Sequence, residues 1–251
     1  MKIYQIVFSP TGGVKRVADL LCSAWNVVPE PINLMNHVGP LFFSEEDLCL
    51  IAVPVYGGRV PEAALKALRE MRGNGIPTVL VAVFGNRAVD DALLELRDET
   101  RACGFACFAA LEAVAQHSLL PCFGQDRPDA EDAKELASFA VKILDEWEKG
   151  KNSEPAHLPG HRPYRAYSGV PMKPKPNRFC EECGLCAREC PVQAIPLEEP
   201  KKLDPNKCIS CMHCASICPQ EGRSISRLML HIARRKMKDA CSGRKPNVLY
   251  L

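Results

Sequence analysis

The chain has 251 residues, enough for one large or two modest domains, and its 47% of hydrophobic residues is enough for a buried core. The formal net charge of +2 conceals an asymmetry, because residues 172–251 carry 15 Lys/Arg against 8 Asp/Glu. No apolar run reaches the length of a membrane span, and no nucleic-acid recognition module accompanies the basic part. The first residues lack a signal-peptide pattern, so we expect a cytoplasmic protein whose 14 cysteines stay reduced.

The chain opens with a strand, a glycine-bearing turn and a helix. An apolar, β-rich run at 2–8 predicts the strand, and helical spacing of apolar residues at 14–25 predicts the helix. The turn between them can present backbone N–H groups to a phosphate at the positive end of the helix dipole. The Walker pattern and the G-x-G-x-x-G fingerprint are both absent, and a plain βα turn is the alternative interpretation. The candidate phosphate-binding residues are Ser9, Thr11, Gly12, Gly13 and Val14.

Strands and helices alternate along the next hundred residues. Further strands are expected at 27–34, 48–53, 78–84 and 105–115, and the first of these is expected at a sheet edge because of its prolines. Helical stripes follow at 61–71, 89–102 and 129–147. This alternation predicts a doubly wound parallel α/β sheet with five βα units, whose ligand lies at the carboxyl ends of the strands.

Three loops at that edge resemble the flavin-binding loops of flavodoxins. SPTGG is similar to the flavodoxin phosphate loop, PVYGGRVP resembles the loop on one side of the flavin, and FGNR resembles the loop on the other side. The resemblance implies the strand order 2-1-3-4-5 and bound FMN, with Tyr56 against the ring and Asn86 at its polar end. Tyr56 as an ordinary loop aromatic and His117 as a loop hydrogen-bonding residue are the alternatives to functional roles. The remaining candidate FMN-binding residues are Pro54, Val55, Tyr56, Gly57, Gly58, Phe84, Gly85, Asn86 and Arg87.

Residues 151–177 contain six prolines and no helical stripe. Prolines favour extended structure, so this segment is predicted to be a semi-rigid connector. Tyr164 and Tyr167 are candidates for fixing it to the preceding domain.

Two cysteine runs follow the connector, and each has the spacing C-x2-C-x2-C-x3-C-P. This spacing is typical of bacterial two-cluster iron–sulfur segments, in which the fourth cysteine of each run serves the other cluster. A zinc site would leave the third cysteine of each run without a role, and a disulfide framework requires a secreted chain. The segment resembles a bacterial two-cluster ferredoxin. The predicted ligand sets are Cys180, Cys183, Cys186 and Cys218 for cluster 1, and Cys208, Cys211, Cys214 and Cys190 for cluster 2.

The last thirty residues predict an amphipathic helix and an apolar tail. Ile225, Met229 and Ile232 begin an apolar face, and a run of basic residues occupies the opposite side. We expect the helix to pack on the ferredoxin or at the domain interface, and the tail NVLYL to dock into that interface. Outside the two runs, we expect buried core thiols at Cys22, Cys49, Cys103 and Cys107, and exposed thiols at Cys122 and Cys241.

The whole chain resembles a flavodoxin–ferredoxin fusion. The expected parts are an FMN-binding domain at 1–150, the connector at 151–177, a two-[4Fe–4S] ferredoxin domain at 178–222, and a helix and tail at 223–251. The resemblance implies an anaerobic electron carrier that exchanges electrons with redox protein partners. A flavin-dependent oxidoreductase acting on a small acceptor is the second hypothesis, with His117 as its proton donor, and an FMN-free scaffold is the third.

Overall fold

The computed structural model describes residues 2–36, 39, 41–150 and 153–251. Its larger part is a twisted sheet built from β1 (Ile3–Val7), β2 (Glu30–Asn33), β3 (Leu48–Pro54), β4 (Pro77–Phe84) and β5 (Ala106–Val114). These five strands are parallel and lie in the order β2-β1-β3-β4-β5, which confirms the flavodoxin-like order. β3 and β4 are buried along their whole length, as expected for apolar strands at the centre of a sheet covered on both faces.

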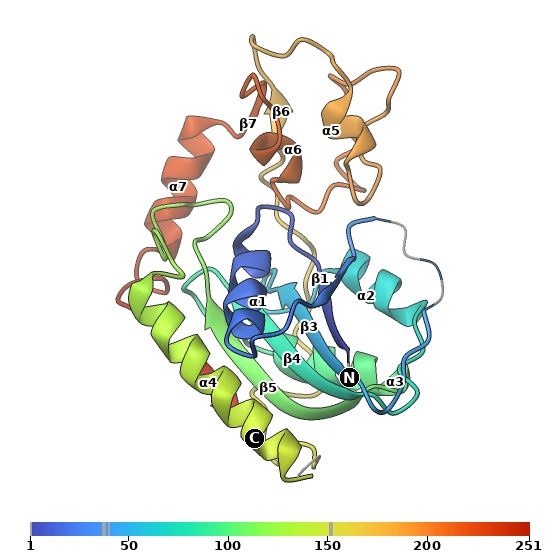
Figure 1. The fold of residues 1–251 in the computed structure, drawn as a ribbon. Helices are drawn as coiled ribbons and strands as arrows, with labels where there is room; N and C mark the ends of the chain where they lie inside the picture. Colours follow the sequence, from blue (N-terminus) through green and yellow to red (C-terminus); the bar gives the residue numbers. More distant parts are fainter. Residues whose placement is uncertain (1, 37–38, 40, 151–152) are drawn as a thin grey trace.

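Helices cover both faces of this sheet (Figure 1). α1 (Gly13–Ser23) and α4 (Ala130–Glu148) pack on one face, and α2 (Glu62–Arg69) and α3 (Ala92–Ala102) pack on the other. Asp129 caps α4 by accepting hydrogen bonds from the backbone of Glu131 and Asp132, each at 3.0 Å. The described residues between β2 and β3 form no helix, so the second of the five expected βα units has no helix in the described part of the chain.

The C-terminal tail adds a sixth strand to the sheet. β8 (Val248–Tyr250) pairs antiparallel with β5, and Tyr250 lies opposite Ala110 in the register. The Asn247 side chain accepts a hydrogen bond from the backbone N–H of Val114 at 2.8 Å, just before the strand begins. The expected docking of the tail into the domain interface is therefore wrong, because the open edge of β5 offers backbone hydrogen-bonding groups that the tail satisfies.

The cysteine-rich segment is small and lies beyond the carboxyl ends of the parallel strands (Figure 1). It contains a two-stranded ladder of β6 (Lys175–Pro176) and β7 (Arg223–Ser224), and the short helices α5 (Leu185–Arg188) and α6 (His213–Ser216). α7 (Arg227–Met237) descends from it along the side of the larger domain. No helix of the described residues is both long and apolar enough to cross a bilayer.

The described part of the connector, from residue 153 onward, is fixed to the larger domain; residues 151 and 152 lie outside the described residues. The hydroxyl of Tyr164 donates to Asp98, and Asp91 accepts from the backbone of His161 at 2.9 Å and of Arg165 at 2.7 Å. The Asp91 carboxylate therefore holds the connector. These contacts hold the connector against the larger domain.

Candidate functional site

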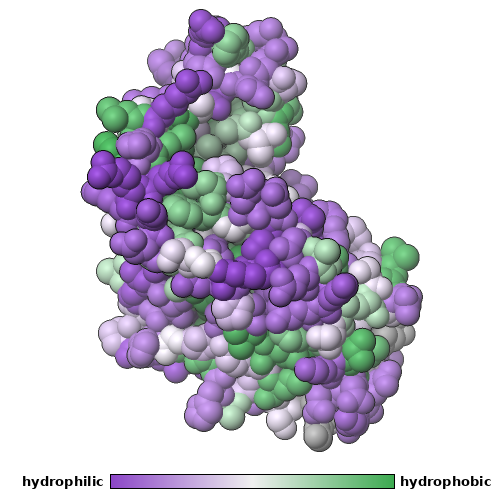
Figure 2. All heavy atoms as spheres, turned by 90° about the vertical axis from the view of Figure 1, so that its left-hand side faces the viewer, coloured by the Kyte–Doolittle hydropathy of each residue, from purple (hydrophilic) through white to green (hydrophobic). Residues whose placement is uncertain are grey.

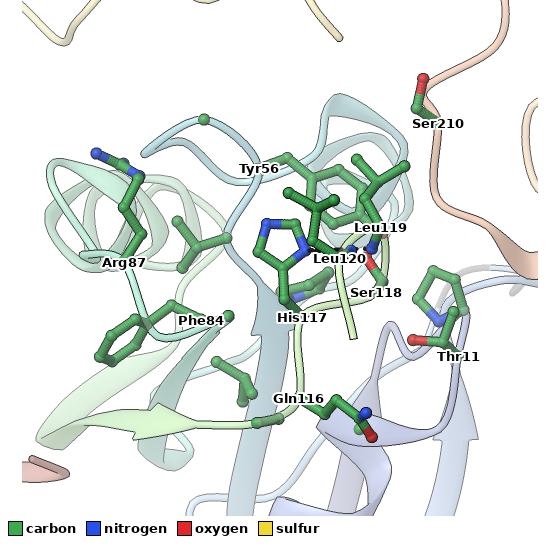
Figure 3. Close-up of a pocket in the computed structure, with 18 of the residues that line it drawn as sticks. Thr11, Tyr56, Phe84, Arg87, Gln116, His117, Ser118, Leu119, Leu120 and Ser210 are labelled. Atoms are coloured by element: carbon green, nitrogen blue, oxygen red, sulfur yellow. Dashed lines mark hydrogen bonds between the residues drawn. The ribbon is translucent and has the colours of Figure 1, made fainter. Parts of the chain in front are cut away.

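A cavity of about 240 Å³ lies at the carboxyl ends of β1, β3, β4 and β5. The loops after these strands form its floor and walls, and Figure 3 shows their side chains converging on it. This is the edge at which doubly wound sheets bind ligands. All but two of the fourteen predicted FMN-binding residues line it: Ser9, Thr11, Gly13, Val14, Pro54, Val55, Tyr56, Gly57, Gly58, Phe84, Gly85 and Arg87.

The loop after β1 has the geometry of an anion site. Gly12 adopts a left-handed conformation, with φ of 85°, and α1 starts at the next residue with its N-terminus toward the cavity. Ser9 accepts a hydrogen bond from the backbone of Lys15 at 2.9 Å, so its hydroxyl fixes the turn. The Lys15 ammonium pairs with Asp19 on the outer face of the helix, so the loop presents mainly backbone N–H and hydroxyl donors.

The loop after β3 is a tight turn held by reciprocal hydrogen bonds. The backbone of Tyr56 donates to Arg59 at 2.9 Å and accepts from it at 3.2 Å, and Gly57 and Gly58 both have positive φ. A Cβ on Gly57 would come within 3.0 Å of the Tyr167 ring, so the connector packs directly on this turn. Burial raises the pKa of Tyr56 well above its usual value, and the nearby thiol of Cys211 raises it further. Tyr56 therefore lies between the cavity and the cysteine-rich segment.

The loop after β4 contributes to the cavity without the side chain of Asn86. That amide is buried and donates at 2.8 Å to the backbone carbonyls of Cys241 and Gly243. It also accepts from the backbone of Lys245 at 3.2 Å and from the Arg127 guanidinium at 3.3 Å, so most of its hydrogen bonds go to the C-terminal tail. The expected contact with the polar end of a flavin is therefore corrected: Asn86 holds the tail, because its left-handed backbone turns the side chain away from the cavity.

The loop after β5 supplies a wall that the site prediction omitted. Gln116, His117 and Ser118 line the cavity, and the Nδ1 atom of His117 accepts from the backbone of Leu119 at 3.1 Å and of Leu120 at 3.3 Å. Burial, and then the charge of Arg87, lowers the pKa of His117 to about 4. The imidazole is therefore neutral near pH 7 and carries its proton on Nε2. The position of this loop at the carboxyl end of β5 was the signal that would have identified it.

The cysteine-rich segment covers the cavity. The cavity is lined on this side by Val170 and Met172 of the connector, Ile209 and Ser210 of the second cysteine run, and Met237 of α7. The same contact continues at the phosphate loop, since the ring of His213 lies 2.6 Å from the carbonyl oxygen of Pro10 and Ser216 donates to that oxygen at 3.3 Å. No pattern within the second run distinguishes these residues as neighbours of the first domain.

The eight cysteines of the two runs have the donor chemistry that iron–sulfur clusters need. All are free thiols, and one small cavity is lined by four of them that come from both runs. Backbone N–H groups donate to Cys190, Cys208 and Cys218 at 3.1–3.5 Å, and the buried guanidinium of Arg223 donates to Cys186 at 3.2 Å. Such donors stabilise thiolates and the anionic clusters they bind. The cysteines that line the small cavity are Cys180, Cys183, Cys186 and Cys218.

The other set also gathers across the two runs. Burial raises the pKa of Cys211 to about 12, and the thiols of Cys190 and Cys208 contribute to the rise. Cys214 has Cys211, Cys186 and Cys208 among its electrostatic neighbours, so it lies near thiols of both predicted sets. Cys190 of the first run thus lies near the second-run thiol of Cys211, as the predicted sharing of cysteines between the runs requires.

Cysteines outside the runs have structural positions. Cys22, Cys49, Cys103 and Cys107 are buried in the α/β domain, as expected, and burial raises the pKa of each. Cys122 is exposed, as expected. Cys241 was also expected to be exposed, but it is buried because it packs under α7.

Comparisons with known proteins identify the cysteine-rich segment. Residues 179–221 match the 4Fe-4S dicluster domain family. A ferredoxin-like protein in the nif region of Sinorhizobium fredii is 45% identical over 47 residues, which are 16% of this chain and 73% of that protein. A trichloroethene reductive dehalogenase of Dehalococcoides mccartyi is 36% identical over 76 residues, which are 22% of this chain and 14% of the dehalogenase.

Solved structures give the remaining comparison. Flavodoxin 2 from Bacillus cereus and a flavodoxin from Streptococcus pneumonia TIGR4 cover 58% and 57% of this chain and 99% of their own chains. Their identities are 14% and 18%, and their TM-scores are 0.43 and 0.39. Through its cysteine-rich segment the chain belongs to the 4Fe-4S ferredoxins, and its larger domain has the flavodoxin-like strand order.

Proposed function

We propose that this protein transfers electrons between two [4Fe–4S] clusters and FMN, as an electron carrier of anaerobic metabolism. The division into a flavodoxin-like domain at 1–150, a connector at 151–177, a ferredoxin domain at 178–222 and a C-terminal helix and tail is part of the proposal. The observation that carries it is the cover of the strand-end cavity: Ile209 and Ser210, from between two cluster cysteines, line the same cavity as the phosphate loop.

The chain offers separate groups for each part of FMN. The turn at Ser9–Val14 would hold the phosphate through backbone N–H groups and the dipole of α1. Tyr56 would lie against the ring, and Gly57 and Gly85 leave room for close approach of the backbone. The neutral Nε2–H of His117 is a donor for a flavin heteroatom. When bound, the clusters supply one-electron centres and FMN supplies a centre that takes one or two electrons.

The two cysteine sets stand at different distances from the flavin cavity. The inner set consists of Cys190 and the first three cysteines of the second run, because Ile209 and Ser210 line the cavity and Tyr56 neighbours Cys211. The set of Cys180, Cys183, Cys186 and Cys218 is the outer set, since its own small cavity shares no residue with the flavin cavity and Cys183 is exposed. An external partner would therefore meet the outer set first.

A specific observation favours the carrier over the oxidoreductase. The oxidoreductase hypothesis needs a proton donor at the flavin, and its candidate was His117. Because the pKa of this imidazole lies near 4, it does not carry an ionisable extra proton near pH 7. Residues of the connector, the ferredoxin segment and α7 also line the cavity, where they would compete with a small acceptor for space.

The test is a count of centres in anaerobically purified protein. We expect about eight iron and eight acid-labile sulfide atoms per chain, from two four-iron clusters, together with one releasable FMN. Replacing Cys190 by Ser should remove the signal of the inner cluster, although Cys190 belongs to the first run, and replacing Cys218 by Ser should remove that of the outer cluster. Four iron atoms in the unmodified protein, or no FMN uptake, would contradict the proposal. Loss of the opposite cluster in each variant would contradict the ligand sets.

A further inference from the structure

α7 uses only a narrow stripe of its surface for packing within the chain. This stripe contacts a small apolar cluster formed by Leu120 and Phe123 of the loop after β5 and by Cys241. The residues of the stripe are Leu230, Ala233 and Met237. The rest of the helix faces away from the protein, including apolar side chains that solvent-exposed helices rarely carry. The exposed fractions are 69% for Leu228, 39% for Met229 and 46% for Ile232.

The same exposed surface is strongly basic. Several arginines on other helices have acidic partners, as Arg69 has Glu62 and Glu99 and Arg97 has Asp98. α7 contains no acidic residue, and the first one after it is Asp239. Figure 2 shows this side of the molecule, with apolar groups set among hydrophilic side chains on its upper part. Five cations on α7 and at its end form no ion pair with another described residue: Arg227, Arg234, Arg235, Lys236 and Lys238.

The exposed helix begins beside the outer cysteine set. Gly222 donates its backbone N–H to the Cys218 thiol at 3.1 Å, and Arg223 donates to the Cys186 thiol at 3.2 Å. α7 starts four residues after Arg223, a span of at most about 14 Å even for extended chain. A protein seated on the first turns of α7 would therefore lie next to the outer set.

We propose that the exposed face of α7 is the docking surface for an acidic redox protein, which exchanges electrons at the outer cluster. This inference rests on the proposed electron-transfer function. The unpaired cations attract an acidic surface and orient it during the encounter, and the apolar residues Leu228, Met229 and Ile232 give the contact a dry centre. A membrane surface is the disfavoured occupant, because the part of the apolar surface formed by Leu230, Ala233 and Met237 is already covered by the protein.

The test is anaerobic stopped-flow reduction of the intact protein by two probes. One probe is a reduced acidic [2Fe–2S] ferredoxin, and the other is the methyl viologen radical, which needs no docking surface. The variant R235E/K236E reverses two unpaired cations on α7, and I232Q removes an apolar contact. K134E/K142E is the control, because it changes the net charge equally on the exposed face of α4.

We expect the second-order rate constant with the ferredoxin to fall about tenfold in R235E/K236E at low salt, and the wild-type rate to fall as salt rises from about 20 to about 200 mM. I232Q should lower this rate without changing its salt dependence, and K134E/K142E should match the wild type. The viologen rate should be the same in all four proteins. Equal ferredoxin rates in R235E/K236E and in the control would overturn the proposed docking surface. It would also be overturned if the wild type bound phosphatidylserine vesicles and its rate with the ferredoxin did not depend on salt. Failure of viologen to reduce the wild type would instead count against the proposed function.

Discussion

The turn at Gly57 offers a sharp test of how the connector is held over the flavin cavity. Gly57 has φ of 61°, and a Cβ there would overlap the ring of Tyr167. Replacing Gly57 by Ala therefore adds two costs. The left-handed conformation costs a residue with a Cβ about 1–2 kcal/mol, and displacement of a packed ring costs about 1–3 kcal/mol. We expect the free energy of unfolding to fall by about 2–5 kcal/mol.

Gly169 provides the matched control for this substitution. It also has a positive φ, of 86°, but a Cβ there would have no neighbour within 4 Å. Replacing Gly169 by Ala should therefore cost only the conformational part, about 1–2 kcal/mol. Urea unfolding followed by tryptophan fluorescence measures the loss of stability in both variants, because the only two tryptophans, Trp25 and Trp147, lie in the flavodoxin-like domain.

A double-mutant cycle separates the overlap from other effects. Combining Gly57→Ala with Tyr167→Ala should destabilise the protein by less than the sum of the two single changes, because the ring that clashes is gone. FMN binding should weaken in Gly57→Ala by about tenfold for each 1.4 kcal/mol of strain that the bound state retains. Equal destabilisation by the substitutions at Gly57 and Gly169, or additive effects in the cycle, would refute the contact between the turn and the connector.

Two further predictions concern buried charge. Asp132 is fully buried and accepts two hydrogen bonds from Arg127, at 2.8 and 2.5 Å, so Asp132→Ala should lower the free energy of unfolding by about 3–5 kcal/mol by leaving that guanidinium unpaired. The exposed Asp145 is the control, since its replacement by Ala should cost less than about 1 kcal/mol, and similar losses at the two positions would contradict the role of burial. His117 has its pKa lowered to about 4, so the unfolded chain gains a proton below about pH 6.5 while the folded protein does not. The contribution of the neutral His117 to the free energy of unfolding is therefore complete above pH 6.5 and is lost as pH falls. At pH 5 the loss is about 2 kcal/mol. Urea unfolding at pH 7.5 and pH 5 should show a smaller acid loss in His117→Gln, and an unchanged loss would contradict the neutral, buried imidazole.

Local chemistry was enough to predict most of the fold and the iron–sulfur character of the cysteine-rich segment. Apolar runs bounded by glycine and proline predicted β1, β3, β4 and β5, because a strand buried on both faces must be apolar along its length, whereas prolines marked the largely exposed β2 as an edge strand. The spacing within each cysteine run predicted its function, because in such runs the first three thiols bind one cluster and the fourth binds the other cluster. The turn from Ser9 to Val14 likewise carried its own signal, since its geometry depends on neighbouring residues alone.

Contacts between segments far apart in the chain were decided only by the tertiary structure. Asn86 lies in a loop whose sequence resembles a flavin-binding loop, yet its amide binds carbonyls more than 150 residues away. His117 gained its neutral state from burial, and burial depends on the whole cover of the cavity. The position of Ser210 against the flavin cavity, and so the order of the two cysteine sets, follows from how one domain sits on the other. The sequence by itself determined the candidate binding residues through local spacing, whereas docking of the two halves decided which residues line the cavity, because that docking sums many weak contacts that no single motif records.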